Sequence, residues 1–198
     1  MTSERKDLGL SLWLLPPESF KPSSAVSKLT VKTFPDSPNF CQSPSFIPHI
    51  TLTSSIPAPA QALLPSLKLD LLTPPEIEFG ELAHGDTYFK FIFLRIKKSV
   101  TLLSLAKFVR EQLPYASAFN DYLYDPHISL VYSNQEPTEE RVKYVGQRTD
   151  AALFGSRGWT GGKVALVDTR STNVEEWNIL EEWTFPETDY AANINGEE

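Results

Sequence analysis

Two short segments of the chain combine a histidine with a hydroxyl side chain in the same frame. One reads Pro-His-Ile-Thr-Leu around His49, and the other reads Pro-His-Ile-Ser-Leu around His127. Side chains alternate between the faces of a β-strand, so each histidine shares a face with its hydroxyl residue, Thr51 or Ser129. A single histidine is most often a satisfied core residue, but two of the three histidines lie in this pattern. The repetition favours a functional pair.

Two facing imidazoles suit a reaction in which one proton is taken and another is given. The ordinary histidine pKa of about 6.5 allows one neutral and one protonated ring near neutral pH. The hydroxyls of Thr51 and Ser129 can donate hydrogen bonds to an anion held between the rings, and phosphate fits best. One histidine would then activate water and the other would protonate the leaving oxygen. The sequence leaves open which does which.

This chemistry requires no metal or organic cofactor, and we expect none. His84 lies in Ala-His-Gly-Asp, which is typical of a hairpin turn, and no Asp or Glu cluster has the spacing of metal ligands. The sequence also lacks a phosphate-binding P-loop, a dinucleotide-binding glycine pattern and a nucleophile elbow, since residues 155–158 have the wrong spacing. The chain is predicted to act independently of metal.

Strands and helices must bring the two motifs together, and the hydrophobic pattern predicts an α+β chain. Ser99 is a suitable cap for a helix whose apolar residues recur at helical spacing. The expected strands are residues 8–15, the Pro-His-Ile-Thr-Leu motif, 75–83, 88–96, the Pro-His-Ile-Ser-Leu motif, 162–169 and part of 177–185. The expected helices are 22–33, a short one in 57–67, 100–113 and 137–153.

Each half of the chain therefore runs strand, helix, histidine strand, helix, strand. Trp13 precedes His49 by 36 residues, and Phe91 precedes His127 by 36 residues. A duplicated lobe can bring two distant histidines face to face across a central cleft. We expect a single bilobal domain over residues 1–188, with two pseudo-symmetric antiparallel-sheet lobes that exchange strands and have helices outside, and an acidic mobile tail at 189–198.

The paired motifs resemble the HxTx and HxSx motifs of the two-histidine (2H) phosphoesterases, and the order of elements is similar over nearly the whole chain. Segments SLWLLP, TYFKFIFL and PHISLVYS most resemble the fungal and plant 2′,3′-cyclic nucleotide 3′-phosphodiesterases. The resemblance implies a hydrolase that converts nucleoside 2′,3′-cyclic phosphates to 2′-phosphates. It also implies a natural substrate in ADP-ribose 1″,2″-cyclic phosphate, a by-product of tRNA splicing, which becomes ADP-ribose 1″-phosphate. His49 and His127 would be catalytic, and Thr51 and Ser129 would bind substrate.

Three aromatic residues are further candidates for substrate binding. Trp13 and Phe89 match positions that stack on a base or sugar in this family, although strand aromatics are more often core residues. Tyr132 matches a family tyrosine, but it lies an odd five residues after His127. It therefore reaches the same face only if the strand ends or bulges there.

The net charge of −7 argues against a protein that holds long nucleic acid through many phosphate contacts. A small nucleotide remains suitable, and Lys90 and Arg157 are either phosphate-attracting or solvated surface cations. No segment is long and apolar enough to span a bilayer, and the single cysteine fits a reducing compartment. We expect an intracellular, cytoplasmic monomer, with association to an internal membrane surface left open.

Two other readings stay open. A 2H enzyme can process RNA ends or 2′,5′ linkages, against which the acidic charge counts. A non-catalytic module could bind nucleotides in the same cleft, although a binder has no need of two proton carriers. Hydrolysis of a panel of cyclic phosphates and a short RNA discriminates among them.

Overall fold

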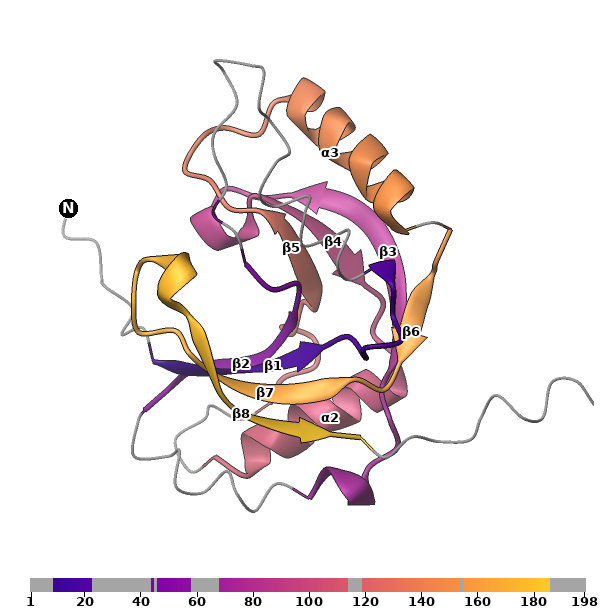
Figure 1. Cartoon of the computed structure of the whole chain (residues 1–198), viewed down its shortest axis with the longest axis vertical. Coiled ribbons are helices and arrows are strands. Elements are labelled where there is room, and N and C mark those ends of the chain that lie inside the picture. Colours follow the sequence, from indigo (N-terminus) through magenta and orange to yellow (C-terminus); the bar gives the residue numbers. More distant parts are fainter. Residues whose placement is uncertain are drawn as a thin grey trace, which may run out of the picture.

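The computed structural model of the chain describes residues 9–22, 44, 46–57, 68–113, 119–153 and 155–185. Figure 1 shows a curled sheet with the helices α2 and α3 packed against it. The strands are β1 (Leu10–Leu15), β2 (Ile50–Ile56), β3 (Glu76–His84), β4 (Ile92–Ile96), β5 (His127–Val131), β6 (Gly158–Thr160), β7 (Lys163–Asp168) and β8 (Asn178–Thr184). The helices are α2 (Val100–Glu111) and α3 (Glu139–Leu153), with 3₁₀ turns η2 (Leu69–Leu71), η3 (Tyr88–Lys90) and η4 (Val174–Glu176).

The strands form one sheet in the order β6-β3-β4-β5-β2-β1-β7-β8, and each pairing is antiparallel. The two histidine strands, β2 and β5, are neighbours at its centre. β3, from the first half of the chain, pairs with β4, and β7, from the second half, pairs with β1. An α+β fold with an antiparallel sheet is thus confirmed. Two pseudo-symmetric lobes around a cleft stay a prediction.

The main core lies on one face of the sheet, where apolar side chains of alternate strand positions meet the helices. Its strand residues include Leu12, Ile50, Leu52, Ile128 and Leu130. α2 adds Leu102, Leu105, Ala106 and Val109 to this core. The predicted cap of α2 is confirmed, because the Ser99 side chain accepts a hydrogen bond from the Leu102 amide. α2 and α3 cover this face of the sheet. The alternate residues of each strand therefore point to the opposite face, away from the helices.

That opposite face carries a smaller buried cluster beside the histidine strands. Its members are Trp13, Leu15, Ala165 and Val167, and the partly buried Trp177 and Ile179 pack against them. β1 and β7 supply the four buried members, so these two strands form the sheet surface beside β2 on this face.

The predicted strand over residues 88–96 is wrong in its first part. Residues 88–90 form the turn η3, and β4 begins only at Ile92. The Lys90 amide donates to the Thr87 carbonyl at 3.0 Å, a bond between near neighbours that an extended strand does not form. Aromatic and β-branched residues favour a strand in sequence, but local hydrogen bonding decides here.

Two smaller corrections concern the extent and the number of the strands. His84, predicted in a hairpin turn, is the last residue of β3, where it pairs with Ile92. The strand β6 is not predicted by the sequence, because its three residues are too few to show an alternating pattern. The helix predicted at 137–153 is confirmed and begins at Glu139.

Several predicted segments cannot be compared with the structure. The helices at 22–33 and 57–67, except for residues 22 and 57, and the tail at 189–198 lie outside the described residues. Within the described ranges, no helix combines the length and apolar character that crossing a bilayer requires.

Two adjacent glycines offer a test of how β7 is joined to β1. Gly161 and Gly162 both have positive φ, 78° and 115°. A Cβ on Gly162 would lie 2.2 Å from the Leu15 carbonyl oxygen, whereas one on Gly161 would lie 3.9 Å from the Pro74 side chain. Gly162→Ala should therefore lower the free energy of unfolding by about 2 kcal/mol more than Gly161→Ala, as measured by urea denaturation. Equal losses would contradict this close approach.

Candidate active site

The register of the two central strands brings both motifs together. β2 and β5 run antiparallel with Ile50 opposite Ile128, and both of these side chains are buried in the main core. Neighbours of a paired residue are themselves opposite in an antiparallel pair, so each histidine lies across from the hydroxyl residue of the other motif. All four motif side chains then share the face away from the helices. We refer to His49, Thr51, His127 and Ser129 as the motif quartet.

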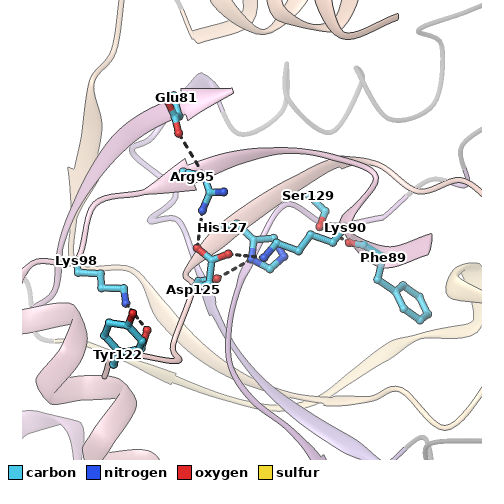
Figure 2. Close-up of polar contacts among 9 residues, drawn as sticks. All are labelled: Glu81, Phe89, Lys90, Arg95, Lys98, Tyr122, Asp125, His127 and Ser129. Atoms are coloured by element: carbon cyan, nitrogen blue, oxygen red, sulfur yellow. Dashed lines mark hydrogen bonds and ion pairs between the residues drawn. The ribbon is translucent and has the colours of Figure 1, made fainter. Parts of the chain in front are cut away.

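Both imidazole rings are held in the same way. His49 Nδ1 lies 2.6 Å from the Ile47 carbonyl oxygen, and His127 Nδ1 lies 2.8 Å from the Asp125 carbonyl oxygen, as Figure 2 shows for the second ring. A carbonyl oxygen can only accept, so Nδ1–H donates in both rings. The neutral rings therefore carry their lone pair on Nε2, which is the atom that can take up or release a proton.

The two hydroxyl residues of the motif quartet differ in their hydrogen bonds. Ser129 Oγ donates to the Phe89 carbonyl oxygen at 2.8 Å, and the Ser129 and Tyr132 side chains are also hydrogen-bonded. Among the described residues, none hydrogen-bonds to the Thr51 hydroxyl, while the Thr51 carbonyl accepts from the Tyr124 hydroxyl at 3.1 Å. Thr51 can donate directly to a ligand, whereas Ser129 must first exchange a partner.

An aromatic ring supports each imidazole. Trp13 stacks on His49 with ring centroids 3.6 Å apart and planes only 8° from parallel. Phe93 meets His127 edge to face at 5.1 Å. Trp13 is only 3% exposed, so its ring packs against the histidine instead of offering an open face for a base. The site thus gains two fixed rings from the strands that flank β2 and β5.

The structural counterpart of Trp13 is Phe93 and not Phe91. In the sheet Trp13 pairs with Thr51, and Phe93 pairs with Ser129. The equal spacing of 36 residues in the sequence points to Phe91 instead, but Phe91 is 2% exposed in the main core. Spacing along the chain includes loops of unequal length, whereas strand register alone decides which rings face one another.

Burial shifts the protonation of both histidines. It lowers the pKa of His49 from 6.5 to about 4; the hydrogen bond to Ile47 opposes this shift, and the charge of His127 adds to it. Burial also lowers the pKa of His127. The charges of Lys90 and Arg95 act in the same direction there, whereas the backbone and carboxylate of Asp125 raise this pKa. Without ligand, both rings are mainly neutral at neutral pH.

A charged network lies beside His127, as Figure 2 shows. The Asp125 carboxylate binds the Lys90 ammonium and, at 3.0 Å, Nη1 of Arg95. Arg95 Nε also lies 3.4 Å from the carboxylate of the exposed Glu81. Burial raises the pKa of Asp125, but the hydrogen bond and charge of Lys90, helped by Arg95, lower it by more. Asp125 is therefore an anion that gathers two cations next to one histidine.

Five aromatic residues form a wall along one side of the motif quartet. They are Phe46, Tyr88, Phe89, Tyr132 and Trp177. β5 ends at Val131, so Tyr132 leaves the alternation of the strand and turns toward Ser129 and toward Phe46, on which it stacks at 3.9 Å.

In this aromatic wall Phe89 is exposed, Tyr88 and Trp177 are partly buried, and Phe46 and Tyr132 are buried. Phe89 is 38% exposed, and its ring lies 5.6 Å from that of Trp177 with an angle of 30° between the planes. Trp177 also lies 5.7 Å from Trp13, so it connects the two sides of the motif quartet. Trp177, Phe93 and Asp125 are not predicted as site residues by the sequence. Asp125 precedes His127 by two residues, as Ile47 precedes His49. This matching position in the two motifs could have identified Asp125 from the sequence.

Arg157 does not join the motif quartet. It is exposed and lines a separate cavity of about 370 Å³ between β3 and α3. This cavity includes Leu94 of the main core, so it opens on the helix side of the sheet. In the part of the chain that the structure describes, no three His, Cys, Asp or Glu side chains are grouped to hold a metal ion.

Known proteins match this chain over most of its length. The family model of cyclic phosphodiesterase-like proteins matches residues 8–185. A 2′,3′-cyclic-nucleotide 3′-phosphodiesterase of Phaeosphaeria nodorum is 31% identical over 193 residues, which cover 88% of this chain and 97% of that protein. The protein of the same name from Yarrowia lipolytica is 29% identical, and the match covers 87% of this chain and 98% of the Yarrowia protein.

Solved structures share the fold at low sequence identity. Escherichia coli LigT complexed with NADP+ has a TM-score of 0.56 and 13% identity, covering 91% of this chain and 99% of LigT. LigT complexed with 3′-AMP has a TM-score of 0.57, with 13% identity and coverage of 91% and 98%. The fungal relatives confirm the enzyme class and the resemblance seen in the sequence. With its family model matched from residue 8 to residue 185, the chain belongs to the cyclic phosphodiesterase-like proteins.

Proposed function

We propose that the motif quartet hydrolyses cyclic phosphate diesters by acid–base catalysis with two histidines. The substrates are nucleoside 2′,3′-cyclic phosphates, which give 2′-phosphates, and ADP-ribose 1″,2″-cyclic phosphate, which gives ADP-ribose 1″-phosphate. The observation that carries the proposal is the common orientation of the rings. Both Nδ1–H groups are bound to backbone carbonyls, so both Nε2 atoms are left to exchange protons on one face of the sheet.

In this mechanism the phosphate lies between the two imidazoles. Thr51, and Ser129 once its hydroxyl turns from Phe89, donate hydrogen bonds to the non-bridging oxygens. A neutral histidine takes a proton from water, whose oxygen forms a new bond to phosphorus. The bond from phosphorus to the leaving ester oxygen breaks, and that oxygen receives the proton of the other, protonated histidine. The leaving oxygen is the 3′ oxygen of a nucleoside 2′,3′-cyclic phosphate or the 2″ oxygen of ADP-ribose 1″,2″-cyclic phosphate. In-line attack requires the two rings on opposite sides of phosphorus.

The aromatic wall gives the two halves of the site different surroundings. Phe89 and Trp177 offer stacked, partly exposed rings on one side, which suits the base of a nucleoside. Such asymmetric contacts can orient the ribose so that only one ester oxygen leaves. The names of the fungal relatives support departure of the 3′ oxygen, and the LigT complexes with NADP+ and 3′-AMP support a ligand of nucleotide size.

A substrate panel tests the proposal against its alternatives. The panel contains ADP-ribose 1″,2″-cyclic phosphate, the four nucleoside 2′,3′-cyclic phosphates and a short RNA that ends in a cyclic phosphate. Hydrolysis of the small molecules without the RNA is expected, because the net charge of −7 disfavours long polyanions. Preference for the RNA would instead support a 2H enzyme that processes RNA ends, and binding without turnover would support a non-catalytic module.

Removal of either histidine should abolish most of the turnover. His49→Ala and His127→Ala are each expected to lower kcat by about 100-fold or more, because each ring transfers a proton in the transition state. The double variant should lose much less than the product of the two, since the rings act as a unit. Kinetics at saturating adenosine 2′,3′-cyclic phosphate measure this.

The third histidine supplies the matched control for this experiment. His84 is exposed at the end of β3, and His84→Ala should retain wild-type kcat. If His49→Ala or His127→Ala turned over like the His84 variant, the two-histidine mechanism would be wrong.

The pH dependence should be bell-shaped and displaced toward acid. The productive state has one neutral and one protonated ring, and it is populated between the two pKa values of the coupled pair. Burial lowers the pKa of His49 to about 4, and that of His127 is lowered as well. The profile of kcat/KM should therefore peak below pH 6.5. The profile of kcat should lie at higher pH, because the bound anion raises both pKa values. A kcat/KM that still rises above pH 8 would contradict an imidazole acid.

The regiochemistry of ring opening should be strict in the wild type. Phosphorus NMR of the products from adenosine 2′,3′-cyclic phosphate is expected to show only the 2′-phosphate. Phe89→Ala should raise KM about tenfold through lost stacking, and Tyr132→Phe should slow turnover or admit some 3′-phosphate through the lost hydrogen bond to Ser129. Predominant 3′-phosphate from the wild type would refute the proposed leaving oxygen.

A further inference from the structure

The proposed reaction increases the negative charge at phosphorus. A cyclic phosphate diester carries one negative charge, whereas the monoester product carries nearly two at neutral pH. Groups that bind this growing charge more strongly than the initial charge accelerate the reaction. One histidine gains a proton as the other gives one up, so the pair of rings gains no net positive charge while the negative charge grows. A positive group that does not give up its proton would complement the site.

Lys90 is placed to supply that charge. Its ammonium is bound by the carboxylate of Asp125, whose carbonyl fixes the His127 ring. It lies 4.9 Å from the centroid of the Phe93 ring, which packs against His127 in a T-shaped contact. In Figure 2 the Lys90 side chain runs alongside His127. The ammonium and the imidazole therefore occupy the same corner of the site.

The backbone of the turn that carries Lys90 is hydrogen-bonded to β5 and to the segment that follows β5. The carbonyl of Phe89 accepts from the Ser129 hydroxyl, and the carbonyl of Tyr88 accepts from the Ser133 amide at 3.2 Å. The Lys90 side chain is 32% exposed, so a ligand can reach it. The turn η3 thus holds this lysine at the motif quartet, unlike a solvated lysine on an open surface.

The numbers of hydrogen-bond donors on Ser129 and Lys90 also point to Lys90 as a group that can bind phosphate. A serine has a single hydroxyl hydrogen, and that of Ser129 points to Phe89. An ammonium has three N–H donors, so Lys90 can bind a phosphate oxygen while it keeps Asp125. We propose that Lys90 is a phosphate ligand of this site, positioned by Asp125, and that its charge stabilises the second negative charge that develops on phosphorus. This inference rests on the proposed function.

Two substitutions of Lys90 separate charge from packing. Lys90→Met keeps most of the apolar stem and removes the charge, whereas Lys90→Arg keeps the charge. We expect Lys90→Met to lower kcat with adenosine 2′,3′-cyclic phosphate about tenfold or more, with a smaller change in KM, and Lys90→Arg to stay within about threefold of wild type.

Equilibrium binding supplies a readout that a purely structural role would not give. Adenosine 2′-phosphate and uncharged adenosine are titrated against each variant by calorimetry. Lys90→Met should weaken binding of the 2′-phosphate about tenfold and leave binding of adenosine within about twofold, because only the former presents a phosphate to the ammonium. If Lys90→Met does not fold, Lys90→Gln serves for the same comparison.

Lys107→Met is the matched control. Lys107 lies on α2, where it pairs with Glu111 at 3.7 Å, and the variant should behave like the wild type. The inference is overturned if Lys90→Met binds both ligands as the wild type does, or if Lys90→Arg is as impaired as Lys90→Met. A wild type that hydrolyses no cyclic phosphate would instead overturn the proposed function, and selective loss of 2′-phosphate binding would still identify Lys90 as a phosphate ligand.

Discussion

The pairing of Ile50 with Ile128 is the constraint on which the site depends. It joins the two strands that carry the motifs, and burial of both isoleucines in the main core fixes which face every neighbour takes. A shift of one residue would turn one histidine into the core and leave an apolar side chain in its place. The helices α2 and α3 stabilise this register from the far side, because they cover the face on which the isoleucines are buried. Core packing and site geometry thus share one cause.

The sequence was sufficient to predict the parts of the site that repeat in the two motifs. The two histidine motifs, the antiparallel strands that hold them and the cap of α2 all follow from local patterns, and the structure agrees. It was insufficient where geometry depends on contacts between distant residues. Phe93 contacts His127 because of strand register, and the turn at residues 88–90 breaks an apparently continuous strand through hydrogen bonds that propensity does not reveal. Trp177 gave no signal, since a tryptophan before a final strand reads as core.

The two imidazoles are alike in their hydrogen bonds but differ in electrostatic surroundings. His49 lies under an indole and is the more deeply buried ring, with a pKa lowered to about 4. His127 lies next to an anion and two cations, whose effects on its pKa oppose one another. The two copies of the motif therefore hold their imidazoles in inequivalent electrostatic surroundings. In the proposed mechanism, which needs one base and one acid, this inequivalence gives the two rings different affinities for the proton that the pair carries.

The hydrogen bond from Ser129 to the Phe89 carbonyl links the two residues that the proposed function assigns to phosphate and to base. One hydrogen cannot serve two acceptors fully, so a phosphate that recruits Ser129 competes with the backbone of the turn that carries Phe89. In the proposed mode of binding, occupancy of the phosphate position would alter the freedom of the Phe89 ring, and by linkage a base stacked on that ring would alter the affinity for phosphate by the same factor. The base and the phosphate of a nucleotide bound in this way would be thermodynamically coupled, so their separate binding free energies need not add up to that of the intact molecule.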